Sequence, residues 1–385
     1  MNICMVSDLY DTPYGGVSTV IKRIVPKLLE RGHKVIIITS MFKGKKSVER
    51  KGNLVVYRFP SVVLPKCQQE FSFSFPSIQK IFEIYKNEKV EIIHCHVPSL
   101  LTVICILVAK DFKIPIIATH HMDSETYLAN LGLVSKETRF LFYRTLNIFF
   151  NHADLVTTPS HYKLKLVKKH GLKTKGKVLS NGIDLSRFKS DIDCKPFLRK
   201  FKLKKGTKKI LFVGRLMREK GIDVLVKALP IINSKIPNTK LIIVGKGYLE
   251  EELKKLVNEL KLKNVIFTGF ISLDMLRQVY ASCDIFVLPS FVESQGLVLL
   301  EALASGKPAV GSKITAIPEL VVNGWNGYTF KPGNHEELAK KIIRILSDEK
   351  LMKKFSKNSL KLVKKHDMEK IVDKLEKTYK DFIKY

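Results

Sequence analysis

The chain has 385 residues, 45% of them hydrophobic, and a formal net charge of +31. This length exceeds what one ordinary core needs and predicts two domains of similar size. The longest apolar run, from Leu100 to Ala109, is about half of what a membrane-crossing helix requires. The N-terminus lacks the pattern of a secretory signal, and six cysteines without a CxxC pair favour a reduced, cytosolic protein.

The first half of the chain alternates apolar strands with helical patterns. A strand at 3–6 is followed by a loop rich in turn formers and a helix from about Gly16 to Arg31. Further strands are expected at the following positions: 33–39, 90–96, 115–120, 153–159 and 177–180. Such alternation predicts a parallel sheet covered by helices on both faces.

The same alternation starts again at Lys209. Five more strands are expected: 209–214, 239–245, 264–269, 283–289 and 307–312. We therefore predict two doubly wound α/β domains facing a cleft, at 1–184 and 209–365, joined by a linker at 185–208. A final amphipathic helix at 366–385 could pack back on the first domain. Ligands of such sheets bind beyond the carboxyl ends of the strands.

Positive charge is concentrated at residues 151–210, where 17 Lys or Arg accompany 4 Asp or Glu. The stretch from Tyr162 to Lys177 holds seven lysines and no acid. This field attracts phosphate-rich partners, and a membrane-facing patch and a merely solvated helix face explain it equally well. Nucleic-acid binding is disfavoured, because almost no aromatics interleave with these lysines.

Two loops are candidates for binding phosphate. Gly15 and Gly16 precede the first long helix, where exposed backbone N–H groups could approach a phosphate, although a plain tight turn fits equally well. The pattern is not GxGxxG, which disfavours an NAD site. Arg215 and Lys220 follow the strand at 209–214, where two cations could neutralise a leaving diphosphate without a metal ion. Exposed basic residues on a basic protein are the alternative.

Two glutamates lie eight residues apart around a third candidate loop. Glu293 precedes a helix expected to begin near Gln295 or Gly296, and Glu301 lies in its second turn. The N–H groups of Gly296 and Leu297 at the helix start suit a phosphate. Glu301 could then accept hydrogen bonds from a ribose, while Glu293 stays near the group beyond the phosphate.

Two possible metal motifs are disfavoured. The triplet His94-Cys95-His96 alternates across the two faces of an apolar strand. The D-x-D formed by Asp191 and Asp193 lies in the charged interdomain stretch and not at the end of a buried strand. We therefore expect no metal ion and no cofactor.

Taken in order, these motifs resemble the family-4 retaining glycosyltransferases, which have the GT-B fold of two Rossmann-like domains. The likeness covers nearly the whole chain and rests on the two glutamates and on six short stretches: GGV at 15–17, ERGHKVIII at 30–38, THH at 119–121, SNGID at 180–184, VGRLMREKG at 213–221 and VGKG at 244–247.

The resemblance implies a role for each matching residue. Gly16 would approach the donor phosphates, Arg215 and Lys220 would bind the diphosphate, Glu301 would hold the ribose, and Glu293 would lie beside the transferred sugar. His121 would lie near the reacting sugar and the acceptor. The base pocket would be lined by backbone around three residues: Gly245, Gly247 and Phe270.

Two features look like the branch that glycosylates diacylglycerol: the pair Gln295-Gly296, and the THH loop followed by Tyr127. The N-terminal strands also resemble enzymes acting on phosphatidylinositol. The expected activity is metal-independent hexose transfer with retention, from a nucleotide sugar such as UDP-glucose to a lipid at the cytoplasmic membrane face. GDP-mannose or UDP-N-acetylglucosamine as donor, and a phosphoinositol lipid, polysaccharide or soluble polyol as acceptor, stay open. The intact site residues argue against a catalytically silent sugar-binding protein.

Overall fold

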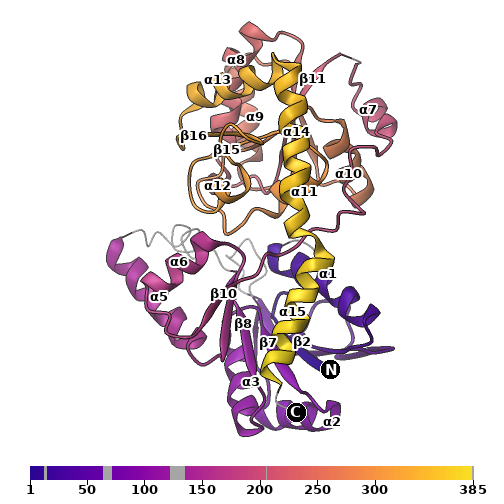
Figure 1. Ribbon diagram of the computed structural model, residues 1–385, viewed down its shortest axis with the longest axis vertical. Coiled ribbons are helices and arrows are strands. Elements are labelled where there is room, and N and C mark those ends of the chain that lie inside the picture. Colours follow the sequence, from indigo (N-terminus) through magenta and orange to yellow (C-terminus); the bar gives the residue numbers. More distant parts are fainter. Residues whose placement is uncertain (13–14, 64–71, 122–134, 205, 384–385) are drawn as a thin grey trace. The chain divides into compact units, whose positions relative to one another are not determined.

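The structure is a computed structural model that describes residues 1–12, 15–63, 72–121, 135–204 and 206–383. The chain divides into two compact units (Figure 1). Unit 1 comprises Met1–Asn181 together with Met368–Tyr385, and unit 2 comprises Gly182–Asp367. Each unit is built around its own largely parallel sheet, as the alternation of strands and helices predicts.

The sheet of unit 1 has the strand order β10-β9-β8-β7-β1-β2-β4-β3, and only β3 runs antiparallel to its neighbour. Its strands are β1 (Asn2–Val6), β2 (Lys34–Ser40), β3 (Val48–Lys51), β4 (Leu54–Phe59), β7 (Ile92–Cys95), β8 (Ile116–Thr119), β9 (Leu155–Thr158) and β10 (Gly176–Val178). The inner strands are buried on both faces, which explains their almost continuous apolar sequences. A small hairpin, β5 (Ser61–Val63) with β6 (Ser72–Ser74), lies outside this sheet.

Helices cover both faces of this sheet. One face packs against α2 (Ile78–Glu88), α3 (Leu100–Asp111), α5 (Lys136–Phe150) and α6 (His161–Lys169). Outside this core, α1 (Gly16–Glu30) packs against the last helix, α15 (Met368–Phe382). Arg31, just after α1, forms ion pairs with Glu369, Asp373 and Glu376 of α15. The last helix thus belongs to unit 1.

The sheet of unit 2 is entirely parallel, in the order β13-β12-β11-β14-β15-β16. Its strands are β11 (Lys208–Val213), β12 (Thr239–Val244), β13 (Val265–Gly269), β14 (Ile285–Leu288), β15 (Ala309–Ser312) and β16 (Gly327–Phe330). Because β11 pairs with both β12 and β14, the strand order reverses there. Such a switch point is where doubly wound sheets bind ligands.

The helical elements of unit 2 are α7 (Lys195–Lys200), η1 (Arg218–Lys220), α8 (Ile222–Lys235), α9 (Glu250–Glu259), α10 (Leu273–Ser282), α11 (Leu297–Ala304), α12 (Ile317–Leu320), α13 (His335–Leu346), α14 (Glu349–Val363) and η2 (Lys364–His366). Among the residues described in either unit, no helix is both long and apolar enough to cross a membrane.

The stretch predicted as a linker, 185–208, is an integral part of unit 2. It carries α7, and the side chains of Phe188 and Phe197 are buried in the core of the unit. The charged residues around them suggested an exposed connection, but two buried aromatic rings are enough to hold the segment against the sheet.

Candidate functional site

The strongest candidate site lies in unit 2, beyond the carboxyl ends of β11 and β14. The loop after β11 carries Arg215 and Lys220, and the loop after β14 carries Glu293. A backbone hydrogen bond from Phe291 N to Glu219 O, 2.8 Å long, joins the two loops. The switch point therefore brings together residues that lie more than seventy positions apart in the chain.

Glu293 is held from several directions. Its Oε1 accepts from Lys220 Nζ at 2.8 Å and from Ser290 Oγ at 3.0 Å. Its backbone N–H donates to Thr315 Oγ1 at 3.1 Å. Within the described residues, Oε2 accepts no hydrogen bond, so one oxygen of a well-fixed carboxylate is available to a ligand.

Arg215 is less tightly held than Lys220. Its Nη2 lies 3.7 Å from Glu219 Oε1, and its side chain is 39% exposed against 17% for Lys220. Both cations thus lie in the loop after β11. Lys220 is more buried and paired with Glu293, whereas Arg215 is more exposed to solvent. An anionic ligand at this strand end could contact both.

The helix after Glu293 begins as the sequence indicates. Gly296 is the N-cap of α11 with φ of +87°, and no side chain caps the helix. The first N–H groups, beginning with Leu297, carry the positive end of the helix dipole. Glu301 is buried, and its Oε2 lies 3.0 Å from Tyr280 OH. Its carboxylate is therefore oriented by a hydroxyl from α10.

The glycines predicted for the base pocket have a packing reason of their own. A Cβ at Gly245 would lie 1.9 Å from the carbonyl oxygen of Gly214, and one at Gly247 would lie 2.2 Å from that of Leu216. They let the loop after β12 pack directly on the loop that carries Arg215. Phe270, just beyond β13, is 47% exposed and lies at the same edge of the sheet.

In unit 1, His121 follows β8 and is linked to a buried row of polar side chains. His96 Nδ1 lies 3.0 Å from His121 Nε2, and His94 contacts Thr119 Oγ1 and Tyr379 OH at 2.6 Å each. Burial lowers the pKa of His121 to about 4 and that of His96 well below its usual value. Both rings are neutral at pH 7, so one donates its ring proton to the other.

The remaining candidates of unit 1 are only partly described. Gly15 is the N-cap of α1, Gly16 is its first residue, and both are exposed. No described atom lies within 4 Å of a Cβ built at Gly16, so crowding does not require glycine there. Tyr127, the predicted acceptor contact, lies outside the described residues.

The two disfavoured metal motifs have other partners. Both ring nitrogens of His94 contact hydroxyl groups, and Asp193 Oδ1 accepts from Lys195 N at the start of α7. In the described part of the chain, no three His, Cys, Asp or Glu side chains are grouped as metal ligands.

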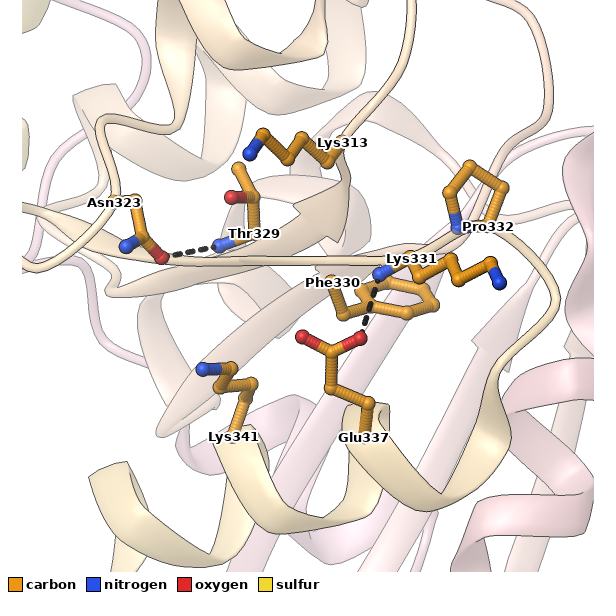
Figure 2. Close-up of a pocket in the computed structure, with 8 residues that line it drawn as sticks. All are labelled: Lys313, Asn323, Thr329, Phe330, Lys331, Pro332, Glu337 and Lys341. Carbon is orange, nitrogen blue, oxygen red and sulfur yellow. Dashed lines mark hydrogen bonds between the residues drawn. The ribbon is translucent and has the colours of Figure 1, made fainter.

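A cavity of about 380 Å³ lies elsewhere in unit 2 (Figure 2). It is lined by Lys313, Asn323, Thr329, Phe330, Lys331, Pro332, Glu337 and Lys341. Glu337 already accepts a hydrogen bond from Lys331 N at 2.9 Å. No residue that the sequence nominates lines this cavity, and we do not place the reaction there.

Three residues of the candidate site were not predicted from the sequence: Ser290, Thr315 and Tyr280. Ser290 lies three positions before Glu293, so its place in the same loop was the only available signal. Thr315 and Tyr280 reach Glu293 and Glu301 from other strand ends and helices, 22 and 21 positions away. No local sequence pattern predicts such tertiary contacts.

Two Rossmann-like units of this kind define the GT-B fold. HepE of Anabaena, solved in complex with UDP, superposes with a TM-score of 0.80 at 22% identity, covering 99% of this chain and 100% of that one. The model of the Glycosyltransferase Family 4 matches residues 14–187, and that of the Glycosyl transferases group 1 matches residues 195–362. The chain therefore belongs to the glycosyltransferases and consists of a Family 4 domain followed by a group 1 domain.

Two curated relatives are similar over most of their length. The alpha-monoglucosyldiacylglycerol synthase of Streptococcus pneumoniae is 29% identical over 317 residues, 80% of this chain and 70% of the relative. An uncharacterized glycosyltransferase of Methanocaldococcus jannaschii is 29% identical over 361 residues, 90% of each chain.

Proposed function

We propose that this glycosyltransferase moves a hexose from a nucleotide diphosphate sugar, with UDP-glucose favoured, to the hydroxyl of a lipid such as diacylglycerol. The observation that carries the proposal is the pairing of Lys220 with Glu293, just before the N-terminus of α11, at the switch point of unit 2, with Arg215 in the same loop as Lys220. Cations and helix amides suit a diphosphate, and a fixed carboxylate suits the sugar beyond it.

In the proposed reaction, the bond from the anomeric carbon to the diphosphate breaks on the same face at which the acceptor oxygen bonds. The acceptor proton passes to the departing diphosphate, so the anomeric configuration is retained and no covalent enzyme intermediate forms. Arg215, Lys220 and the first N–H groups of α11 stabilise the charge on the leaving group. Glu293 Oε2 orients the sugar and offsets positive charge that develops on its ring. Arg215 and Lys220 take the place of a metal ion.

The other predicted contacts fit the same donor. Glu301, aligned by Tyr280, accepts hydrogen bonds from the ribose, and Phe270 with the backbone of Gly245 and Gly247 lines the base pocket. In unit 1, Gly15 and Gly16 bind phosphate through backbone N–H groups. His121, neutral at pH 7, acts as a hydrogen-bonding partner of the sugar or acceptor.

A lipid acceptor is supported by the surface of unit 1 as well as by the diacylglycerol-acting relative. On α5, Phe140, Leu141 and Ile148 are between 51% and 65% exposed, and Arg144 lies in the same stripe. Amphipathic surfaces of this kind lie in the headgroup region of membranes. We infer peripheral attachment to the cytoplasmic face.

The lysine-rich stretch predicted from the sequence lies next to this stripe. Asn147 of α5 donates to Val167 O and His170 O at the end of α6, so the two helices are neighbours (Figure 1). Six of the seven lysines between Tyr162 and Lys177 are exposed, whereas Lys163 is buried against the ring of Tyr143. The exposed ones add attraction to anionic lipids.

Transfer measured across UDP-glucose, UDP-N-acetylglucosamine and GDP-mannose tests the proposal, with diacylglycerol in vesicles that contain or lack anionic lipid. We expect UDP-glucose to be the best donor, with activity that persists in EDTA and an α-linked product. Anionic vesicles should raise the rate. Loss of activity in EDTA that manganese restores, or equal rates with a soluble polyol and no vesicles, would contradict the proposal.

A matched pair of variants separates membrane attachment from catalysis. Leu141→Glu places a negative charge in the exposed stripe of α5. It should lower vesicle binding roughly 30-fold, because a leucine side chain buried in the membrane contributes about 2 kcal/mol. Leu273→Glu makes the same change at an exposed position of unit 2 and should leave vesicle binding unchanged. Equal binding by both variants would exclude α5 from the membrane contact.

A further inference from the structure

Thr315 has an unusual backbone conformation. It lies in the turn between β15 and α12 with φ of +52°. In this left-handed region the branched Cβ of threonine crowds the backbone, and for β-branched residues the conformation is a genuine outlier. Among the residues described, four other non-glycine residues have positive φ, and all are lysines that lie one or two positions after the end of a helix: Lys89, Lys113, Lys202 and Lys261. Helix ends commonly adopt this conformation.

Thr315 therefore differs from the other four in residue type and in place. It precedes a helix, follows a buried strand, and is branched at Cβ. A residue is held in such a conformation only where the surrounding contacts determine it, and these positions are concentrated at functional sites.

Two hydrogen bonds of this turn are made with Glu293. Thr315 Oγ1 accepts the backbone N–H of Glu293 at 3.1 Å, and the next amide, Ala316 N, donates to Glu293 O at 3.4 Å. The turn thus holds both backbone polar groups of one residue. Ser290 and Lys220 hold the side chain of the same residue through Oε1.

We propose that Thr315 is a positioning residue for sugar transfer: its hydroxyl, held in place by the left-handed backbone, fixes Glu293 so that Oε2 meets the sugar. This inference rests on the role proposed for Glu293. Glycine would adopt the same backbone without strain but has no hydroxyl, so the threonine supplies an acceptor at a position where its backbone is unfavourable.

Three variants at this position separate the effect of the backbone strain from the effect of the hydroxyl group. Thr315→Gly removes both, and we expect an unchanged or higher melting temperature together with a kcat lowered about tenfold, because a loosened catalytic group is misplaced. The KM for the donor should change by less than about twofold. Thr315→Ser keeps the hydroxyl and should restore kcat to near the wild-type value. Thr315→Val keeps the branch without the hydroxyl and should lower kcat like glycine.

Lys261→Gly is the matched control. It relieves the same backbone conformation behind α9, away from Glu293, and should raise stability without changing kcat. If the role of Thr315 were merely structural, Thr315→Gly would also raise stability without changing kcat. A wild-type kcat in that variant would therefore overturn the inference.

Glu293→Gln, measured in the same assay, shows whether a negative result refutes the proposed role of Glu293 or only the inference about Thr315. An active Glu293→Gln enzyme would refute the role of Glu293, and the inference about Thr315 with it. An inactive Glu293→Gln enzyme beside a fully active Thr315→Gly enzyme would refute the inference about Thr315 alone.

Discussion

Replacing Glu293 with glutamine is expected to lower kcat by roughly 10²–10³-fold, about 3–4 kcal/mol of transition-state stabilisation. The amide oxygen can still accept from Lys220 Nζ and Ser290 Oγ, so the loop keeps its hydrogen bonds. The charge beside the sugar is what disappears. Steady-state kinetics with UDP-glucose, together with a thermal melt, measures both effects.

Glu337→Gln serves as the control for this change. Glu337 is also a carboxylate of unit 2 that is held by a hydrogen bond, in its case from the backbone N–H of Lys331, and it lines the separate cavity of Figure 2. Its replacement should leave kcat at the wild-type value. A Glu293→Gln enzyme as active as Glu337→Gln would remove Glu293 from the reaction.

Lys220→Met is expected to weaken UDP binding by roughly 10- to 100-fold, because a hydrogen bond to a charged group contributes about 1.5–3 kcal/mol. The side chain is only 17% exposed, so salt screens its interaction with a diphosphate weakly. kcat should fall as well, since the cation also stabilises the leaving group. Calorimetric titration with UDP measures the binding loss directly.

Lys227→Met is the matched control, because Lys227 lies on α8 in the same unit and pairs with exposed Asp223. It should bind UDP like the wild type. Equal UDP affinity in Lys220→Met and Lys227→Met would show that Lys220 does not contact the diphosphate.

The sequence predicts most of the fold because the buried strands are nearly continuous apolar runs. Every strand expected between 209 and 312 is present, and the two-unit organisation is confirmed. In the two main sheets, the sequence did not reveal β3, β4 and β16, which are polar, close to a sheet edge, or only four residues long, and it also did not reveal the three-residue strands β5 and β6. Their pairing depends on neighbours far away in the chain, which periodicity does not report.

The candidate site is predictable where the local sequence marks the end of a strand or the start of a helix. Arg215, Lys220 and Glu293 follow buried strands, and Gly296 begins a helix, so their positions could be inferred from the chain. The supporting residues could not, because Thr315 and Tyr280 reach the site only through tertiary packing. Gly245 has a second reason to be glycine that the sequence does not reveal, because a Cβ there would collide with the carbonyl oxygen of Gly214; its role in the base pocket stays a prediction.

The central claim is that the diphosphate of the donor binds to Arg215, Lys220 and the N-terminus of α11 in unit 2. A crystal structure of the protein with UDP, and a second with GDP, tests it most directly. We predict phosphate oxygens within hydrogen-bonding distance of both cationic side chains and of the first amides of α11. UDP bound elsewhere, or Arg215 and Lys220 directed away from its phosphates, would contradict the claim.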